Sequence, residues 1–270
     1  MHGALMCHNS GLGDFILMNG AVNFVSKNFD ESHLVAMAGG KKLSNVRHLY
    51  KDSSVNVLGI GPASSFQSAG KAIRRYQNHY KNPQKMNGQK WDTRRCFFWG
   101  TDKWESQGIN AYGLHPKNNH WCETFYAAFG VPYEARYTHF SFKRDRDREK
   151  RLEDTLGLQA KYSLLFDQAN IRDFRLPIKS ANYETVRVTT FGWDTIFDWM
   201  GVIENAQEIF TVDTSWFHLI KQMRLDIPKY YIWARGVPYI NLISSGYLND
   251  DYDSGWEILL ADGKPYPPKT

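Results

Sequence analysis

Two short polar turns carry the residue types in this sequence that could do chemistry. The first, residues 9–14 (NSGLGD), ends in Asp14, and the second, residues 213–215 (DTS), is followed by His218. A carboxylate can accept a proton from a substrate hydroxyl. Hydroxyl groups and the free N–H groups at a helix start can hold a diphosphate or a sugar. The turns therefore offer a proton acceptor in one half of the chain and a ligand-binding turn in the other.

The first turn separates a short apolar run from a long one, which predicts a strand, a glycine turn and a helix. Gly11 and Gly13 would let the backbone turn tightly and approach a ligand closely. A dinucleotide fingerprint is excluded because Ile16 stands in place of its third glycine, and no Gly-Lys-Ser/Thr triplet of a phosphate loop follows. Asp14 is then either the N-cap of the helix or a general base that projects into a cleft.

The second turn follows a predicted strand and opens a helix, which places Asp213, Thr214 and Ser215 at a sheet edge. His218 lies one helical turn further, on the side that faces the same place. These residues are candidate contacts for a ligand. The alternative is a capped helix with a histidine packed in its first turn.

Two more stretches of the second half could add to this ligand site. After the first strand of that half come Arg172 and Arg175, and Arg172 is the better candidate to neutralise a leaving diphosphate. After the next strand, Phe191 or Trp193 could stack on a nucleobase, with Gly192 allowing the backbone to approach it. The alternatives are a surface arginine in a loop and aromatic anchors of the core.

The elements that must position these turns alternate between short apolar runs and amphipathic stretches. Such alternation is typical of parallel sheets with helices on their faces. We predict strands at residues 4–7, 33–38, 55–60, 94–99, 162–166, 186–190, 208–212 and 230–234. Helices are expected at residues 15–27, 41–50, 64–80, 121–129, 195–203 and 215–223.

The alternation is interrupted once, by the charged residues 142–157, which we expect to form a solvated linker that leads into a charged helix. Because the alternation then restarts, we predict two α/β domains, residues 1–158 and 159–270. The tail from residue 238 is rich in Gly, Pro, Asp and Tyr. Its apolar residues 256–260 need cover, so we expect the tail to pack back over the body.

The composition limits the class of protein. A chain of 270 residues can bury one large core or two small ones, and a net charge of +5 is too small to indicate a nucleic-acid partner. Its 3 cysteines fit no metal spacing and favour a reducing compartment. Without an apolar run of membrane length or a signal-peptide pattern, we expect a cytoplasmic protein with no transmembrane segment.

In their order and spacing the two turns resemble motifs of GT-B-type glycosyltransferases. Gly13-Asp14 near the N-terminus, paired with ENAQEIFTVDTSWFHL at residues 204–219, is similar to the heptosyltransferase-like group and to uncharacterised glycosyltransferases of bacteria and large DNA viruses. The resemblance covers the two motifs and the general order of elements. It implies an α/β fold of two Rossmann-like halves facing across a cleft, in a compact version.

The resemblance also implies a function, that of a hexosyl- or pentosyltransferase. Asp14 would be the base beside a glycan acceptor in the first domain. Asp213, Thr214, Ser215 and His218 would contact a nucleotide-sugar donor, a UDP-, GDP- or ADP-sugar, in the second domain. With one candidate base and no evident nucleophile, single displacement with inversion is the simpler mechanism, and we expect no further cofactor and no metal.

Other functions stay open at this point. Residues 145–147 and 251–253 both spell D-x-D, the pattern with which metal-dependent GT-A-type glycosyltransferases hold a divalent ion on a diphosphate. A sugar-nucleotide epimerase or dehydrogenase is disfavoured by the absent third glycine. A non-catalytic protein that binds a nucleotide or a glycan would have the same turns without turnover.

Overall fold

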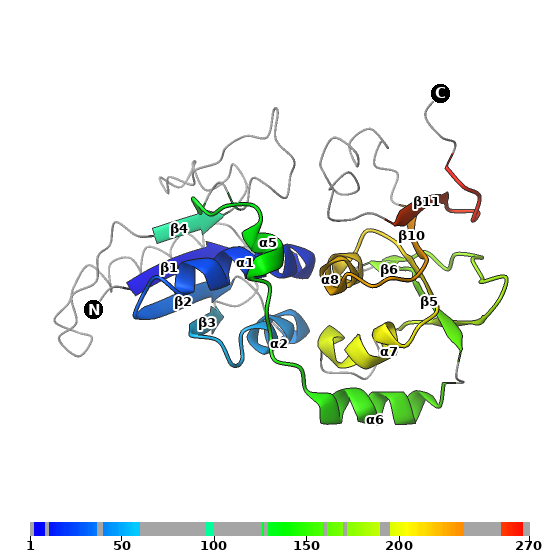
Figure 1. The fold of residues 1–270 in the computed structure, drawn as a ribbon, viewed down its shortest axis with the longest axis horizontal. Helices are drawn as coiled ribbons and strands as arrows, with labels where there is room; N and C mark the ends of the chain where they lie inside the picture. Colours follow the sequence, from blue (N-terminus) through cyan, green and yellow to red (C-terminus); the bar gives the residue numbers. More distant parts are fainter. Residues whose placement is uncertain are drawn as a thin grey trace. The chain divides into compact units, whose positions relative to one another are not determined.

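A computed structural model of the chain describes residues 3–8, 11–36, 40–59, 96–99, 126, 129–158, 161–169, 172–189, 195–234 and 255–266. The chain forms two compact units, Met1–Lys143 and Arg144–Thr270 (Figure 1). The sequence predicts the division later, between residues 158 and 159. The helix that lies between these two positions belongs to the second unit because it packs against the helices that follow it.

The first unit contains a sheet of four strands. They are β1 (Gly3–His8), β2 (Glu31–Ala36), β3 (Val55–Gly59) and β4 (Cys96–Trp99), in the order β3-β2-β1-β4. Every pair is parallel, and the last residues of β1 and β2, His8 and Ala36, are partners in the register. The order reverses between β1 and β4, and open α/β sheets bind ligands at the carboxyl ends of strands at such a switch point.

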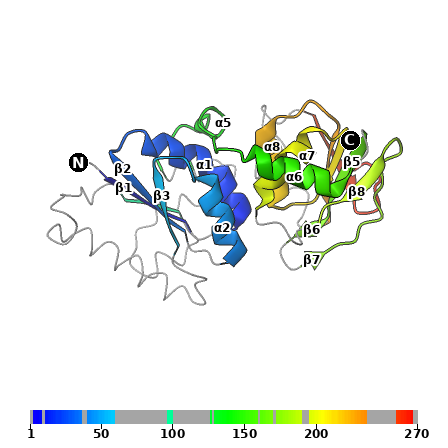
Figure 2. The ribbon, with the colours of Figure 1, turned by 90° about the horizontal axis from the view of Figure 1, so that it is seen from below.

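Among the described residues, the helices of the first unit are α1 (Leu12–Ser26), α2 (Gly40–Leu49) and the short α5 (Ala135–Thr138). Because β1 and β2 are parallel neighbours, α1 and α2 both begin at the same edge of the sheet, and they lie side by side (Figure 2). The helix α5 packs against α1 at Gly20. A Cβ atom at Gly20 would lie 2.2 Å from the carbonyl oxygen of Ala135.

Two buried amides of α1 hold the chain as it leaves the first unit. The Ser141 N–H donates to Asn19 Oδ1 at 2.8 Å, and Asn23 Nδ2 donates to the carbonyl of His139 at 3.1 Å. The same Asn23 group also donates to Asn19 Oδ1 at 3.0 Å. These contacts give partners to Asn19 Oδ1 and Asn23 Nδ2 on a helix that is otherwise almost wholly apolar and buried.

The second unit contains a parallel sheet of five strands. They are β5 (Tyr162–Phe166), β8 (Glu184–Arg187), β9 (Glu208–Thr211), β10 (Lys229–Trp233) and β11 (Trp256–Leu260), in the order β11-β10-β9-β5-β8. The order reverses between β5 and β9, which is the switch point of this sheet. A hairpin of β6 (Gln168–Ala169) and β7 (Arg172–Asp173) follows β5.

In the part of the second unit that the structure describes, four helical segments accompany the sheet. They are α6 (Arg146–Leu156), the 3-10 helix η3 (Ile196–Trp199), α7 (Met200–Glu204) and α8 (Ser215–Met223). One core cluster is formed by buried residues of the strands, of the segment after β7 and of the residue after β9, namely Leu165, Leu176, Ile178, Phe210, Val212, Ile232 and Leu259. The apolar tail segment forms β11, an edge strand of the sheet that pairs with β10.

The observed elements confirm the predicted α/β class, with parallel sheets in both units. The predicted strand at residues 162–166 and the predicted helix at residues 215–223 have the bounds of β5 and α8. The helix predicted at residues 64–80 lies outside the described residues. None of the helices in the described ranges is long and apolar enough to cross a membrane.

Candidate functional site

Asp14 is the third residue of α1 and not its N-cap. Gly11 is the cap, in an extended conformation, and the helix begins at Leu12, earlier than the sequence predicts. The Asp14 carboxylate bends back, and its Oδ2 accepts the N–H of Gly11 at 2.8 Å. The two residues thus close the first turn of α1 at the carboxyl end of β1, with the Asp14 side chain half-buried. Gly13 lies within this turn.

A cation from the neighbouring helix lies close to this turn, and the sequence analysis did not single it out. Lys42 Nζ lies 5.5 Å from the ring centroid of Phe15, the residue after Asp14. Burial lowers the pKa of Lys42, and the negative charge of Asp14 acts in the opposite direction. The available signal was a Lys-Lys pair at the start of a helix that follows the neighbouring strand.

The second turn joins β9 to α8. Thr214 is the N-cap of α8, and its Oγ1 accepts the N–H of Trp216 at 3.2 Å. His218 Nε2 lies 4.0 Å from Asp213 Oδ1, so the structure brings these two predicted residues together. Thr214 and His218 are buried, whereas Asp213 and Ser215 are half-buried.

The residues of the second turn therefore have two different roles. The Thr214 hydroxyl already accepts a bond within the helix start, which is the capping role that the sequence left as an alternative. Asp213 and Ser215 keep part of their side chains in solvent at the N-terminus of α8. A helix start combined with a hydroxyl group suits a phosphate or a sugar hydroxyl.

The candidate cations of the second unit occupy different settings. Arg172 lies on β7, in the hairpin that follows β5. The Arg175 side chain is 82% exposed, and its Nε pairs with Asp173 Oδ2 at 3.2 Å. Phe191, Gly192 and Trp193 lie outside the described residues.

The structure adds an ion pair at the same edge, between a buried carboxylate and an exposed arginine, which the sequence analysis missed. Asp167 follows β5 directly, and its Oδ2 accepts the Leu176 N–H at 2.9 Å and pairs with Arg187 Nη1 at 3.1 Å. Burial raises the pKa of Asp167, against the opposing effects of the Leu176 N–H and Arg187. Arg187 is the last residue of β8, whereas the sequence predicts that strand over residues 186–190 and so places this arginine inside it.

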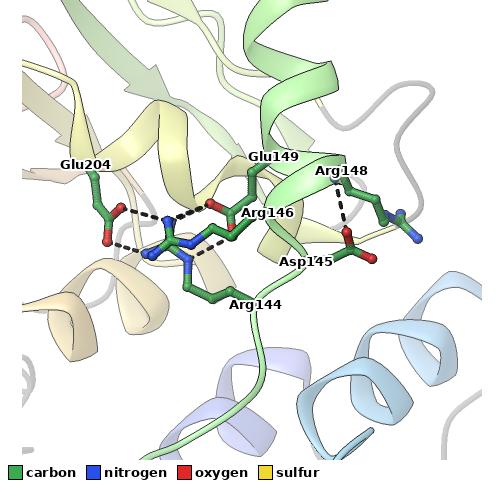
Figure 3. Close-up of polar contacts among 6 residues, drawn as sticks. All are labelled: Arg144, Asp145, Arg146, Arg148, Glu149 and Glu204. Atoms are coloured by element: carbon green, nitrogen blue, oxygen red, sulfur yellow. Dashed lines mark hydrogen bonds and ion pairs between the residues drawn. The ribbon is translucent and has the colours of Figure 1, made fainter.

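The first D-x-D match is part of a helix cap. Asp145 is the N-cap of α6, and its Oδ1 accepts the N–H of Arg148 at 3.1 Å (Figure 3). Asp147 lies exposed in the first turn of the helix, where a negative charge is favourable. Within the described ranges, no group of three or more His, Cys, Asp or Glu residues is placed to hold a metal ion. The second match, at residues 251–253, lies outside the described residues.

The charged stretch around this cap is more than a solvated linker, and that prediction is wrong in this respect. Glu149 is buried, and its carboxylate receives a forked pair of bonds from Arg144, Nε to Oε1 at 2.7 Å and Nη2 to Oε2 at 2.5 Å. Arg144 also bonds to Glu204 at the end of α7, and Arg146 pairs with both acids (Figure 3). The network fastens the start of α6 to α7, which explains why this segment belongs to the second unit.

Comparison with known proteins gives a result at the level of the fold. No protein-family model and no curated protein matches the sequence. Among solved structures, a family 9 glycosyl transferase from Veillonella parvula is similar, with a TM-score of 0.57 at 10% identity, over 96% of this chain and 86% of that one. The E. coli heptosyltransferase WaaC with ADP has a TM-score of 0.50 at 14% identity, over 98% of this chain and 95% of that one. The chain therefore has the GT-B fold of these glycosyltransferases, as the resemblance of its two polar turns implies.

Proposed function

We propose that the protein is a glycosyltransferase that moves a sugar from a nucleotide-sugar donor to a hydroxyl group of a glycan acceptor. Asp14 takes the proton of the acceptor hydroxyl in the first domain. The second domain binds the donor through the turn of Asp213 and Ser215, which Thr214 and His218 support from their buried positions. Gly11 and Gly13 keep the first turn open to the ligand.

The observation that carries the proposal is the place of the two turns in a fold of this kind. Asp14 stands at the carboxyl end of β1, where the order of the first sheet reverses. Asp213 follows β9 at the carboxyl end, beside β5, where the order of the second sheet reverses. Because ligands of open α/β sheets bind at such points, each unit offers one reactive or binding turn at its expected ligand site.

The chemistry needs no group beyond these residues and the two substrates. Asp14 accepts the hydroxyl proton while the acceptor oxygen forms a bond to the anomeric carbon of the donor. The bond from that carbon to the diphosphate oxygen breaks, and the leaving diphosphate is stabilised by the N-terminus of α8 and by a cation, for which Arg172 is the first candidate. A single displacement of this kind inverts the anomeric configuration.

The similar solved structures indicate which nucleotide-sugar donors should be tested first. One of the similar structures is a heptosyltransferase with ADP, so ADP-sugars come first, followed by UDP- and GDP-sugars. The transferred sugar is a hexose or pentose in the proposal made from the sequence, and the heptosyltransferase neighbour adds a heptose to the set that should be tested. Phe191 and Trp193 are the candidates for stacking on the base.

A thermal-shift screen of the full chain against nucleotide sugars tests the proposal. A donor present at about one hundred times its Kd stabilises the protein by roughly 2.7 kcal/mol, which is easily measured. We expect stabilisation by donors of one base, followed by release of the free nucleotide when an acceptor glycan is added. If donors of every base leave the melting temperature unchanged, the proposal is wrong.

Matched variants separate catalysis from binding. Asp14→Asn should keep the donor-induced stabilisation and lose turnover, whereas the exposed Asp30→Asn in the same unit should keep both. Asp213→Asn should weaken donor binding, and the exposed Asp226→Asn should not. A protein that binds nucleotide sugars equally well as wild type and Asp14→Asn, without turnover in either, would be a non-catalytic binding protein.

A further inference from the structure

We infer that Lys42 is a positioning residue for Asp14, and that its ammonium group keeps the Asp14 carboxylate ionised at the start of α1. The consequence for catalysis rests on the proposed function, in which Asp14 is the base. The pairing of the two charges is a property of the protein itself and can be measured without a substrate.

The fold places the two residues at the same sheet edge. β1 and β2 are parallel neighbours that end in register, so the helices that follow them, α1 and α2, start next to each other. Lys42 Nζ lies 5.5 Å from the ring centroid of Phe15, which is buried in the first turn of α1. Asp14 is the acidic residue of this first turn, and its charge acts on the ammonium group of Lys42.

The first turn of α2 is held in place by packing. Gly59 ends β3, and a Cβ atom there would lie 2.3 Å from Leu43 Cδ2. Because glycine has no Cβ atom, the Leu43 side chain can pack against the end of β3. Because Leu43 is the next residue in the chain, this contact also fixes where the Lys42 backbone lies.

The placement of Lys42 is unfavourable for its own helix. Lys41 and Lys42 both lie in the first turn of α2, which carries no acidic residue, and the positive end of the helix dipole disfavours cations there. Lys42 is also half-buried, whereas Lys41 is exposed. Burial lowers the pKa of Lys42, and the carboxylate of Asp14 opposes this change. The charge of Lys42 is therefore supported across the helix pair, by Asp14.

Of the titratable groups on the elements packed against α1, His8 ends β1 at the same edge as Asp14, and the following groups lie elsewhere. Glu31 and His33 stand at the amino end of β2 and contact each other at 2.8 Å. Arg47 and His48 lie in the last turn of α2. Arg136 belongs to α5, which meets α1 at its middle, where its guanidinium donates to the Tyr133 hydroxyl at 2.5 Å. Lys41 and Lys42 are the charged residues of the α2 turn that starts beside Asp14.

The first experiment follows the titration of the Asp14 carboxyl by carbon NMR in the full-length protein. An opposite charge within about 4–6 Å lowers a carboxyl pKa by roughly 1–3 units, and partial exposure reduces that effect. We expect Lys42→Met to move the Asp14 midpoint to higher pH by about half a unit or more, and Lys42→Arg to restore it. The matched control, Lys41→Met, removes an exposed charge of the same sign one residue away and should move the midpoint less.

Two results would overturn the inference. In the first, Lys42→Met leaves the Asp14 midpoint where it is in the wild type. In the second, Lys41→Met moves it as far as Lys42→Met does, which would mean a general change in net charge and not a pairing. Thermal melting of each variant shows whether the first unit is still folded, and Lys42→Gln provides a second neutral variant should Lys42→Met be unfolded.

The second experiment measures sugar transfer as a function of pH. Lys42→Met should move the acidic limb of kcat/KM to higher pH, with about a threefold loss at a fixed pH on that limb for each half unit. The KM for the donor should stay unchanged, because Lys42 acts through Asp14. If the protein transfers no sugar at all, the proposed function is wrong, and the NMR titration alone decides whether Lys42 pairs with Asp14.

Discussion

The buried carboxylate of Glu149 should be one of the most costly charges to remove from the second unit. Its side chain is 3% exposed and that of Arg144 is 16% exposed, and two hydrogen bonds join them. Glu149→Gln keeps the size of the side chain, but places an amide N–H group where a guanidinium N–H now donates. Arg144 then retains only Glu204 as a carboxylate partner in this network.

The size of the effect follows from burial. Removing one partner of a buried ion pair costs about 3–5 kcal/mol, and the remaining bond to Glu204 and the partial exposure of Arg144 place this case near 3 kcal/mol. For a unit of this size, that corresponds to a fall in melting temperature of roughly 10 °C. Differential scanning calorimetry of the full chain measures the fall. Hydrogen exchange of the amides in α6 and α7 assigns it to the second unit.

The same helix offers a control. Lys150 Nζ lies 2.6 Å from Asp154 Oδ1, but these side chains are 68% and 62% exposed. Asp154→Asn should therefore cost much less stability than Glu149→Gln, although the distance is as short. If Glu149→Gln is no more destabilising than Asp154→Asn, the argument that burial determines the strength of this network is refuted.

Two further predictions concern single positions in the two units. Gly20→Ala should destabilise the first unit by about 1–3 kcal/mol in a calorimetric melt, because the new Cβ would lie 2.2 Å from the backbone oxygen of Ala135; a stabilised variant would mean that helix propensity outweighs this clash. Burial acts to raise the pKa of Glu204, but the bonds and charges of Arg144 and Arg146 lower it overall from 4.5. A carboxyl group whose pKa is lower in the folded state than in the unfolded state stabilises the fold at pH values above its unfolded-state pKa. This stabilisation is lost as the pH falls, so the melting temperatures of wild type and Glu204→Gln should converge between about pH 6 and pH 3. A constant difference across that range would contradict the assignment.

Local patterns predict the elements best where polar residues bound a compact apolar run. The strand at Tyr162–Phe166 and the helix at Ser215–Met223 were predicted with their observed ends. In the helix, the hydroxyl of Thr214 caps the first turn and so marks the start in the sequence itself. The fold class followed from the alternation of such segments.

Helix starts that depend on backbone conformation were predicted less well. The sequence places the start of the first helix after Asp14, because glycines usually interrupt helices. In the structure Gly11 is the cap and Gly13 is helical, so Asp14 becomes the third residue and bonds back to the cap. The candidate base thus keeps its place at the sheet edge, and of its two alternative roles only the N-cap is corrected, because Asp14 contacts the cap from the third helical position.

Contacts between distant parts of the chain account for what the sequence analysis missed. In the sequence, Glu149 is one more charged residue of a run that we expected to be solvated. In the structure it contacts Arg144, which also pairs with Glu204, and the packing of α7 on α6 brings Glu204 to this place. Likewise, the tail segment Trp256–Leu260 needs cover by its composition, but only the sheet shows that it pairs with β10 as an edge strand.

The sequence by itself determined the alternation of strands and helices, and with it the positions of the two polar turns at strand ends. These features depend on periodicity, glycine and capping residues within a few positions of one another. Only the tertiary structure decided the strand orders, the burial of Glu149 and the approach of Lys42 to the first turn of α1. The reason is physical: burial and charge pairing depend on which segments pack together, and that is set by the energy of the whole fold.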